Sequence, residues 1–129
     1  MDSDFEKLLN EAKKNASKRI LTEYADCGQV ATAILTTKGN IYTGINSNIT
    51  CSLGNCAEYA AVLEMLKNNE TEIAKILTYT AKGKIYSPCG RCRELLRMIN
   101  EKNLNCQVMV DENKVVLLKD LLPDIFEKI

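Results

Sequence analysis

The chain has 129 residues, of which 46% are hydrophobic and 26% are charged, as is typical of one globular domain. Its 17 basic residues balance 17 acidic residues, so the net charge is zero. This balance argues against a strong electrostatic affinity for nucleic acid or for an anionic membrane, but it is compatible with a small substrate. We therefore expect a single domain over residues 1–129 that binds a small molecule, with neither nucleic acid nor membrane as a partner.

The six cysteines could form a disulfide framework, but other features of the sequence favour reduced thiols. The N-terminus, Met1-Asp2-Ser3-Asp4, continues as a charged helical pattern and has no apolar signal segment. No apolar run approaches the roughly 18 residues of a membrane span. We therefore expect a cytoplasmic protein, in which a Cys-x-x-Cys pair more often serves metal or redox chemistry.

The spacing of apolar residues predicts the elements in the first half of the chain. Phe5, Leu8 and Ala12 recur at helical intervals between charged residues, which predicts an amphipathic helix over residues 3–22. Two strands joined by a short glycine turn follow, and then a polar loop and a second helix. The predicted ranges are 30–35 and 41–46 for the strands, 47–55 for the loop and 56–66 for the helix.

The second half of the chain alternates short apolar runs with helical patterns. The predicted elements are strands over 73–79, 106–110 and 115–118, a polar loop over 81–84, a helix over 89–100, and a turn with a short helix over 121–126. The whole order is helix-strand-strand-helix-strand-helix-strand-strand-helix, without a repeat or a linker. This order predicts an α/β fold, a three-layer α/β/α sandwich around a mixed sheet of about five strands.

Two short motifs, Cys56-Ala57-Glu58 and Pro88-Cys89-Gly90-Arg91-Cys92, each stand at the predicted start of a helix. Zinc binds deprotonated sulfur, and a catalytic zinc site combines three protein ligands with a fourth position that is open to water. Cys89 and Cys92 lie on one side of a first helical turn, so one ion can bind both. Cys56 would come from the other helix. The sequence therefore predicts a catalytic Zn²⁺ site made of Cys56, Cys89 and Cys92.

Glu58 follows Cys56 by two residues and lies in the same first turn. Free backbone N–H groups and the helix dipole favour anionic groups at this place. The chain contains no histidine, so histidine cannot act as the general base. Glu58 is therefore the best-placed candidate for a general acid and base beside a zinc-activated water.

Three other interpretations of the cysteines stay open at this point. A Cys-x-x-Cys pair at a helix start is also typical of a thiol-disulfide protein, which predicts no special role for Cys56 or Glu58. A structural zinc site needs four protein ligands, and Cys51 could be the fourth. Reduced cysteines can also be small apolar core residues, which is the interpretation that we favour for Cys106.

With its two motifs, the sequence resembles the small zinc-dependent cytidine deaminases, and among them it looks closer to the blasticidin S deaminases. The resemblance runs from about residue 25 to the C-terminus. Besides the two motifs, it rests on Val30-Ala31-Thr32-Ala33, the turn at Gly39, Tyr42-Thr43-Gly44-Ile45-Asn46, Ser87, Arg93 and Leu121-Leu122-Pro123.

The resemblance implies hydrolytic deamination of a free cytosine nucleoside or analogue, such as cytidine, deoxycytidine or blasticidin S, with release of ammonia. Glu58 would move protons from water to ring N3 and to the leaving amine. The backbone N–H of Ala57 would contact ring O2, and the Ser87 carbonyl would meet the exocyclic amine. Asn46 would contact the sugar, and Tyr86, which precedes Ser87, is expected to line the pocket. The family also implies a homotetramer whose sites are lined by neighbouring chains. The alternatives are a non-catalytic zinc-binding module on the same fold and a deaminase of another aminopyrimidine.

Three positions depart from the cytidine deaminase pattern. Asn48 stands where the family usually has a ribose-binding glutamate, Gly28 where it has an aromatic residue, and Tyr59 where it has an arginine. Zinc with three thiolates has a net negative charge, so a positive group should offset it, and Arg91 or Arg93 could do so. These departures fit a nucleoside-like antibiotic or another cytosine derivative better than plain cytidine.

Overall fold

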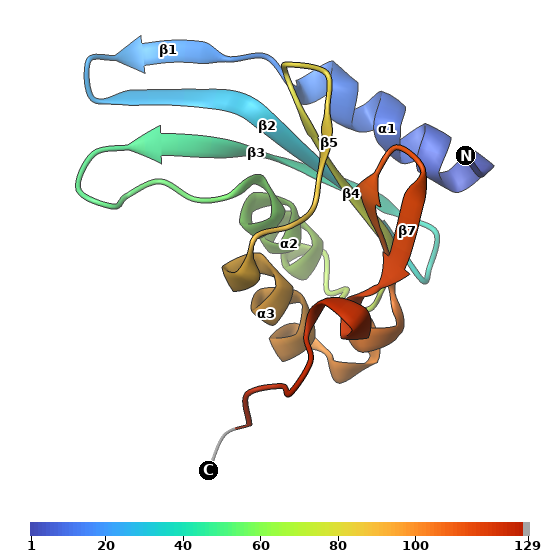
Figure 1. Ribbon diagram of the computed structural model, residues 1–129. Helices are drawn as coiled ribbons and strands as arrows, with labels where there is room; N and C mark the ends of the chain where they lie inside the picture. Colours follow the sequence, from blue (N-terminus) through green and yellow to red (C-terminus); the bar gives the residue numbers. More distant parts are fainter. Residues whose placement is uncertain (128–129) are drawn as a thin grey trace.

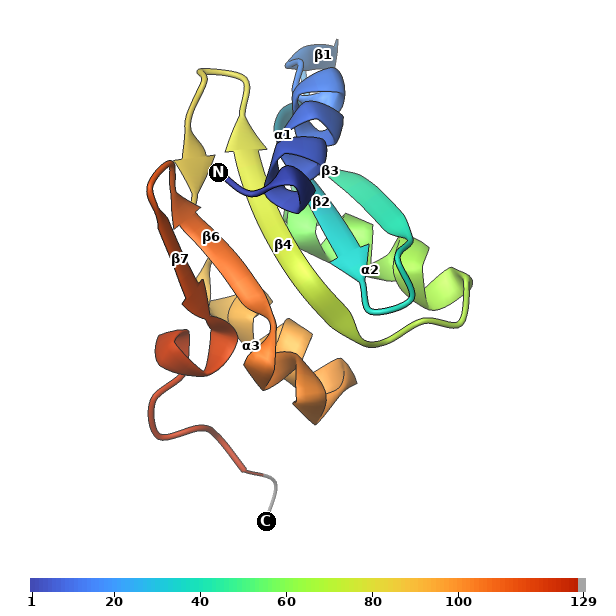
Figure 2. The same ribbon diagram turned by 90° about the vertical axis from the view of Figure 1, so that its right-hand side faces the viewer.

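The structure is a computed structural model that describes residues 1–127, and it consists of a mixed β-sheet with helices on both faces (Figure 1). The turned view in Figure 2 looks onto the face that α1 covers. The elements in chain order are α1 (Ser3–Asn15), β1 (Arg19–Thr22), β2 (Ala25–Thr36), β3 (Ile41–Ile49), α2 (Ala57–Lys67), β4 (Ile73–Thr80), β5 (Ile85–Tyr86), α3 (Gly90–Ile99), the 3-10 helix η1 (Glu101–Asn105), β6 (Gln107–Asp111), β7 (Lys114–Leu117) and the 3-10 helix η2 (Leu118–Leu121).

The sheet is built around β2, which pairs antiparallel with β3 on one edge and with β4 on the other. β6 then adds parallel to β4, and β7 adds antiparallel to β6. These are the five strands that the sequence predicts. Two short strands raise the total to seven: β1 pairs with the start of β2, and β5 pairs with the end of β4. The sequence did not predict these two, because each is too short or too exposed for a pattern of alternation.

The helices divide between the two faces of the sheet, and this arrangement confirms the predicted α/β/α layers. On one face, α1 buries Phe5 and Leu8 against small residues of β2 such as Ala31. On the other face, α2 and α3 form a second apolar core in which Val62 and Leu96 are fully buried. Alternate residues of β2 serve the two cores, as the two-residue period of a strand requires.

The first helix is shorter than the predicted range 3–22. α1 ends at Asn15, and Arg19–Thr22 forms β1 at the edge of the sheet. The prediction was wrong because Ile20 was taken as part of the buried stripe, whereas its side chain is 80% exposed. The chain leaves the helix after Ala16, whose N–H still bonds to the Ala12 carbonyl.

The C-terminal prediction was also wrong, because no helix forms over residues 125–126. The helical turn lies earlier, in η2, and Asp124 has a left-handed backbone with φ of 51°. A proline at position 123 and a left-handed residue after it interrupt helical hydrogen bonding. The central helices and the strands β4, β6 and β7 agree with their predicted ranges to within one residue, whereas β2 and β3 extend beyond theirs. None of the described helices has the length and apolar character needed to cross a membrane.

Gly44 allows β3 and α2 to approach closely. A Cβ atom at Gly44 would lie 2.3 Å from the backbone nitrogen of Ala61 and 2.8 Å from the carbonyl oxygen of Ala57. Neither backbone atom can move without shifting the whole helix. The absence of a side chain at this position therefore sets the height of α2 over the sheet.

We predict that Gly44→Ala lowers the free energy of unfolding by about 3 kcal/mol or more, because the added methyl group overlaps backbone rather than a movable side chain. Urea denaturation measures this change. Gly90→Ala is the matched control, since nothing lies within 4 Å of a Cβ there. Equal stability of the two variants would contradict this view of the β3–α2 contact.

Candidate functional site

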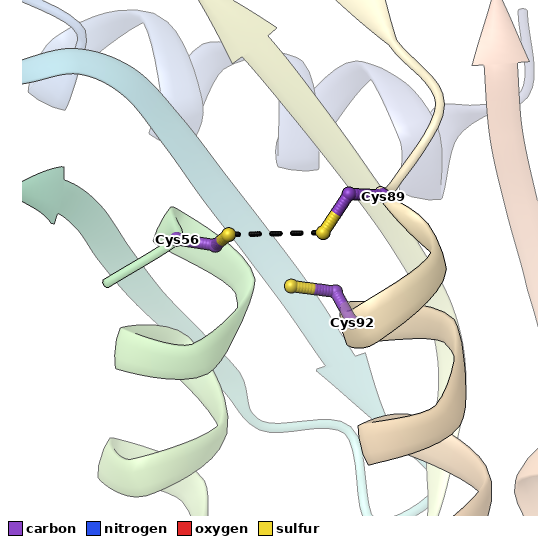
Figure 3. Close-up of side chains that lie close together, drawn as sticks. All are labelled: Cys56, Cys89 and Cys92. Carbon is purple, nitrogen blue, oxygen red and sulfur yellow. Dashed lines mark hydrogen bonds between the residues drawn. The ribbon is translucent and has the colours of Figure 1, made fainter. Parts of the chain in front are cut away.

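Three thiols converge where the N-terminal ends of α2 and α3 meet (Figure 3). The sulfur atoms of Cys56, Cys89 and Cys92 all lie within 4.8 Å of one another, and those of Cys56 and Cys89 are 3.7 Å apart. All three thiols are free, and their exposure falls from Cys89 through Cys56 to the buried Cys92. Among residues 1–127 this is the one group of its kind.

The local structure explains why these sulfurs face one another. Cys56 and Cys89 are the N-cap residues of α2 and α3, and both have an extended backbone, with φ of −68° and −66°. Neither side chain caps its own helix, so each sulfur is available for another partner. Cys92 follows in the first turn of α3, on the side that faces Cys56 (Figure 3).

The thiols influence one another's ionisation. Burial raises the pKa of Cys92 and of Cys56 above the usual range of a thiol. Burial acts in the same direction on Cys89, but its pKa is lowered because the backbone N–H of Cys92 and the neighbouring thiols donate to its sulfur. Burial therefore opposes ionisation of Cys56 and Cys92, and a bound cation would favour the deprotonated form of all three thiols.

This donor set fits a zinc ion. Three sulfur ligands from two helix starts, with one side open to a cavity, match the protein ligands of a zinc site that keeps a position for water. A four-cysteine structural site is not formed, because Cys51 lies outside the cluster, exposed in the loop before α2. Cys106 is buried in the core as predicted, and burial raises its pKa to about 12.

Glu58 lies in the first turn of α2 and is only 5% exposed, although it is one of the residues that line the cavity. The Thr32 hydroxyl lies 3.4 Å from Glu58 Oε1 and 2.7 Å from the Thr78 hydroxyl, its partner across the sheet. Burial raises the pKa of Glu58, while its own backbone N–H and Thr32 oppose that shift. A carboxyl group with a raised pKa can both accept and return a proton near neutral pH.

A cavity of about 480 Å³ opens beside the thiols. It brings together all the substrate-contact residues that the sequence predicts, Asn46, Ala57, Tyr86 and Ser87, and it also contains Glu58, Cys56 and Cys89. Cys92 is buried and does not line the cavity, but its sulfur lies within 4.8 Å of the sulfurs of Cys56 and Cys89. The volume suits a ligand of the size of a nucleoside.

At the far end of the cavity, two asparagines are already held by neighbours. Asn46 Oδ1 accepts a hydrogen bond of 2.9 Å from the Val30 backbone N–H, which leaves the amide NH₂ of Asn46 to donate. Asn48 donates from Nδ2 to Asp26 Oδ1 at 3.0 Å, and the two residues are partners across β2 and β3. A carboxylate therefore lies beside the position where Asn48 lines the cavity.

The two arginines of the second motif have different surroundings. Arg91 lines the cavity, donates to Asn55 Oδ1 at 3.2 Å, and lies over the Tyr59 ring at 5.3 Å from its centroid. Arg93 instead donates to Pro88, Ser87 and Leu121. Arg91 is the one basic residue among the described residues that line the cavity. It is therefore the better placed of the two to offset a negatively charged metal centre.

Sequence reasoning missed the groups that support these side chains. The Thr32 hydroxyl contacts both the Glu58 carboxylate and the Thr78 hydroxyl, and Asp26 accepts a hydrogen bond from Asn48. A threonine inside an otherwise apolar buried strand, as in Val30–Leu35, is a signal that could have indicated the first pair. The Asp26–Asn48 pair depends on strand register, which the sequence pattern did not predict in this part of β2.

Comparison with known proteins agrees with this geometry. Residues 2–108 match the family model of the cytidine and deoxycytidylate deaminase zinc-binding region. A cytidine deaminase of Mycobacterium tuberculosis is 32% identical over 98 residues, which cover 75% of this chain and 71% of the relative. The crystal structure of the cytidine deaminase from Mycobacterium tuberculosis superposes with a TM-score of 0.79, at 27% identity over 98% of this chain and 100% of the other. The cytidine deaminase structure from Burkholderia pseudomallei gives a TM-score of 0.72, also at 27% identity, with the same coverage.

We predict that the purified protein contains about one zinc ion per chain and that Cys89→Ala loses it, because two thiols cannot replace the three-sulfur site. Elemental analysis after gel filtration measures the content. Cys51→Ala is the control, since it removes an exposed thiol outside the cluster. Loss of zinc in both variants, or in neither, would contradict the assignment.

Proposed function

Since the chain belongs to the zinc-dependent cytidine and deoxycytidylate deaminase family, we propose that it hydrolytically deaminates a free cytosine nucleoside or a close analogue. The observation that carries the proposal is the meeting of three features in one cavity: the thiol cluster, the buried Glu58 and a space of nucleoside size. A redox pair or a structural zinc site would need neither the buried carboxylate nor the cavity.

In this proposal Cys56, Cys89 and Cys92 hold the zinc ion, which when bound would act as a Lewis acid that makes water more nucleophilic. The reaction forms a bond between the oxygen of water and C4 of the ring and breaks the bond between C4 and the exocyclic nitrogen. One proton of the water ends on ring N3 and the other on the leaving amine, which departs as ammonia. Glu58 carries both protons, and its raised pKa suits this alternation between acid and base.

The substrate contacts follow from the cavity walls. The N–H of Ala57 belongs to the first turn of α2, where helical N–H groups have no partner within the helix, and it would donate to ring O2. The Ser87 carbonyl, beside Cys89, would accept from the exocyclic amine. The amide NH₂ of Asn46 would donate to a sugar hydroxyl, and the ring of Tyr86, which is 48% exposed, would cover the cavity mouth.

The sugar end of the cavity supports a substrate other than plain cytidine. Asn48 and Asp26 together replace the single glutamate that the family usually has there. No aromatic residue can stand at position 28 on this backbone, because a Cβ on Gly28 would lie 2.2 Å from the Ser17 carbonyl oxygen. The Asp26 carboxylate beside Asn48 would favour a cytosine nucleoside with a cationic substituent, as in blasticidin S.

The proposed enzyme acts as a cytoplasmic homotetramer. All six cysteines are free of disulfides, which suits a reducing compartment. Exposed apolar side chains, among them Ile20, Tyr24 and Leu53, offer surfaces that neighbouring chains would cover. A monomer in sedimentation analysis would contradict the assembly but not the chemistry.

We predict that Glu58→Gln retains zinc but lowers the rate of ammonia release by several orders of magnitude, because the proton carrier is lost. The assay follows ammonia and the ultraviolet change with cytidine, deoxycytidine and blasticidin S. Glu64→Gln is the control, since Glu64 is a solvent-facing residue of the same helix that pairs with Lys67. If the zinc-loaded wild type releases no ammonia from any of the three substrates, the proposed function is wrong.

We also predict that Arg91→Gln weakens zinc binding by about 10–100-fold, the usual contribution of groups around metal ligands. In the wild type, the Arg91 guanidinium group contacts Asn55 and Tyr59. A neutral glutamine at this position would no longer offset the negative charge of the thiolates. Competition with a chromophoric chelator measures the affinity. Lys102→Gln, the same loss of charge in η1, serves as the control. An unchanged affinity in Arg91→Gln would assign the offsetting charge to another group.

A further inference from the structure

Arg93, in α3, uses its guanidinium group to connect two segments that are far apart in the sequence, Ser87–Pro88 and Leu121. Its Nε donates to the Pro88 carbonyl oxygen at 2.8 Å, Nη2 to the Ser87 hydroxyl at 3.0 Å, and Nη1 to the Leu121 carbonyl oxygen at 3.4 Å. Its backbone N–H bonds to the Cys89 carbonyl, so the residue lies one helical turn beyond that cysteine. The side chain therefore folds back over the start of its own helix.

The segment that Arg93 holds belongs to no helix or strand, and the burial of Pro88 is its other support. The pairing of β5 with β4 ends at Tyr86, and α3 begins at Gly90. Ser87 and Pro88 lie between these elements, and Ser87 is exposed at the cavity. Proline also lacks an N–H with which to anchor this connection. In the described part of the chain, the side-chain hydrogen bonds recorded for this connection all come from Arg93.

The contacts of Arg93 also distinguish the two carbonyls of this connection, because only the Pro88 oxygen accepts from Arg93. The residue before a proline is extended, and consecutive carbonyls of an extended chain do not point to the same side. Because Arg93 binds the Pro88 oxygen, we expect the Ser87 oxygen to point to the other side, and Ser87 is the residue of the two that lines the cavity. Leu121, at the end of η2, supplies a fixed point for the other end of the guanidinium group, since η2 is anchored by the buried Leu118.

We propose that Arg93 is a positioning residue for recognition of the exocyclic amine: it fixes the Ser87 carbonyl and connects that wall of the cavity to the C-terminal η2. The inference rests on the proposed function, because it takes the Ser87 carbonyl as the amine acceptor. Three donors in one plane reach three acceptors at once, which the single ammonium group of lysine cannot do. Arg93 thus differs from Arg91, which faces the cavity itself.

The test compares two ligands that differ only in the amine: cytidine and its analogue without the 4-amino group. Equilibrium binding is measured by titration calorimetry on zinc-loaded Glu58→Gln protein, in which cytidine is not consumed. In this background we expect Arg93→Lys to weaken cytidine binding about tenfold, the equivalent of one lost hydrogen bond. Binding of the analogue should stay within about twofold of its original value.

Arg97→Lys is the matched control. Arg97 lies one turn further along α3 and also donates to a C-terminal carbonyl, that of Phe126, but it has no contact with Ser87 or Pro88. It should leave the ratio of the two dissociation constants unchanged. Zinc content and the thermal midpoint identify any variant that has lost its fold, and Arg93→Gln then gives a second substitution at the same position.

Equal weakening of both ligands in Arg93→Lys, or no weakening of either, would overturn the proposal. Ammonia release by the wild type, measured in parallel, reports the proposed function separately. An active wild type with an unchanged ligand ratio in the variant rejects the role of Arg93 alone. An inactive wild type that does not bind cytidine rejects both.

Discussion

The convergence of two helix starts on one point above the sheet is the constraint on which the rest of the site depends. α2 follows β3 at one edge of the sheet, and α3 follows β5 beyond β4, so the two helices start from strands that are not neighbours. The glycine at position 44 allows α2 to lie low on β3, and α3 packs beside it. Three sulfur atoms are thereby placed within 4.8 Å of one another by rigid elements rather than by a loop.

This placement is unfavourable for thiolates alone and favourable for a dication. Burial is the main reason why the pKa values of Cys56 and Cys92 are raised, and the nearby thiols and Glu58 add to the shift at Cys92. The short distances between the sulfur atoms favour binding of a metal ion, because the ion supplies positive charge between them and the sulfurs are already in position. The fold thus holds the three sulfur atoms in place before zinc binds. The positive charge of the zinc ion would then reduce the repulsion between the thiolates.

The charged groups around the cluster are arranged in order of burial. Glu58 lies deepest, under the threonine pair of the sheet, where burial raises its pKa. Arg91 lies at the mouth, over Tyr59, and Arg93 lies to one side with its donors directed at backbone oxygens. Two arginines near the start of α3, only two residues apart, thus have different roles. Arg91 is a cation that lines the cavity, whereas Arg93 binds the segment that forms one wall of the cavity.

The sequence predicted the clustering of the three thiols better than the surroundings of the site. The motifs around Cys56 and Cys89 depend on local helix geometry, which spacing encodes, and the helix starts were correct to within one residue. Strand β1 was missed because an exposed edge strand such as Arg19–Thr22 has no buried face to generate a pattern. The partners of Glu58 and Asn48 were missed for a related reason: they come from other strands, and strand register depends on long-range packing that spacing along the chain does not express.

X-ray absorption at the zinc edge can distinguish a catalytic three-thiolate site from a closed structural site. We expect three sulfur neighbours at about 2.3 Å and one oxygen or nitrogen neighbour at about 2.0 Å, the pattern of a three-thiolate site with one position open to water. Four sulfur neighbours would mean a closed structural site in which Cys51 or another thiol takes the open position. That result would contradict the proposed catalytic centre.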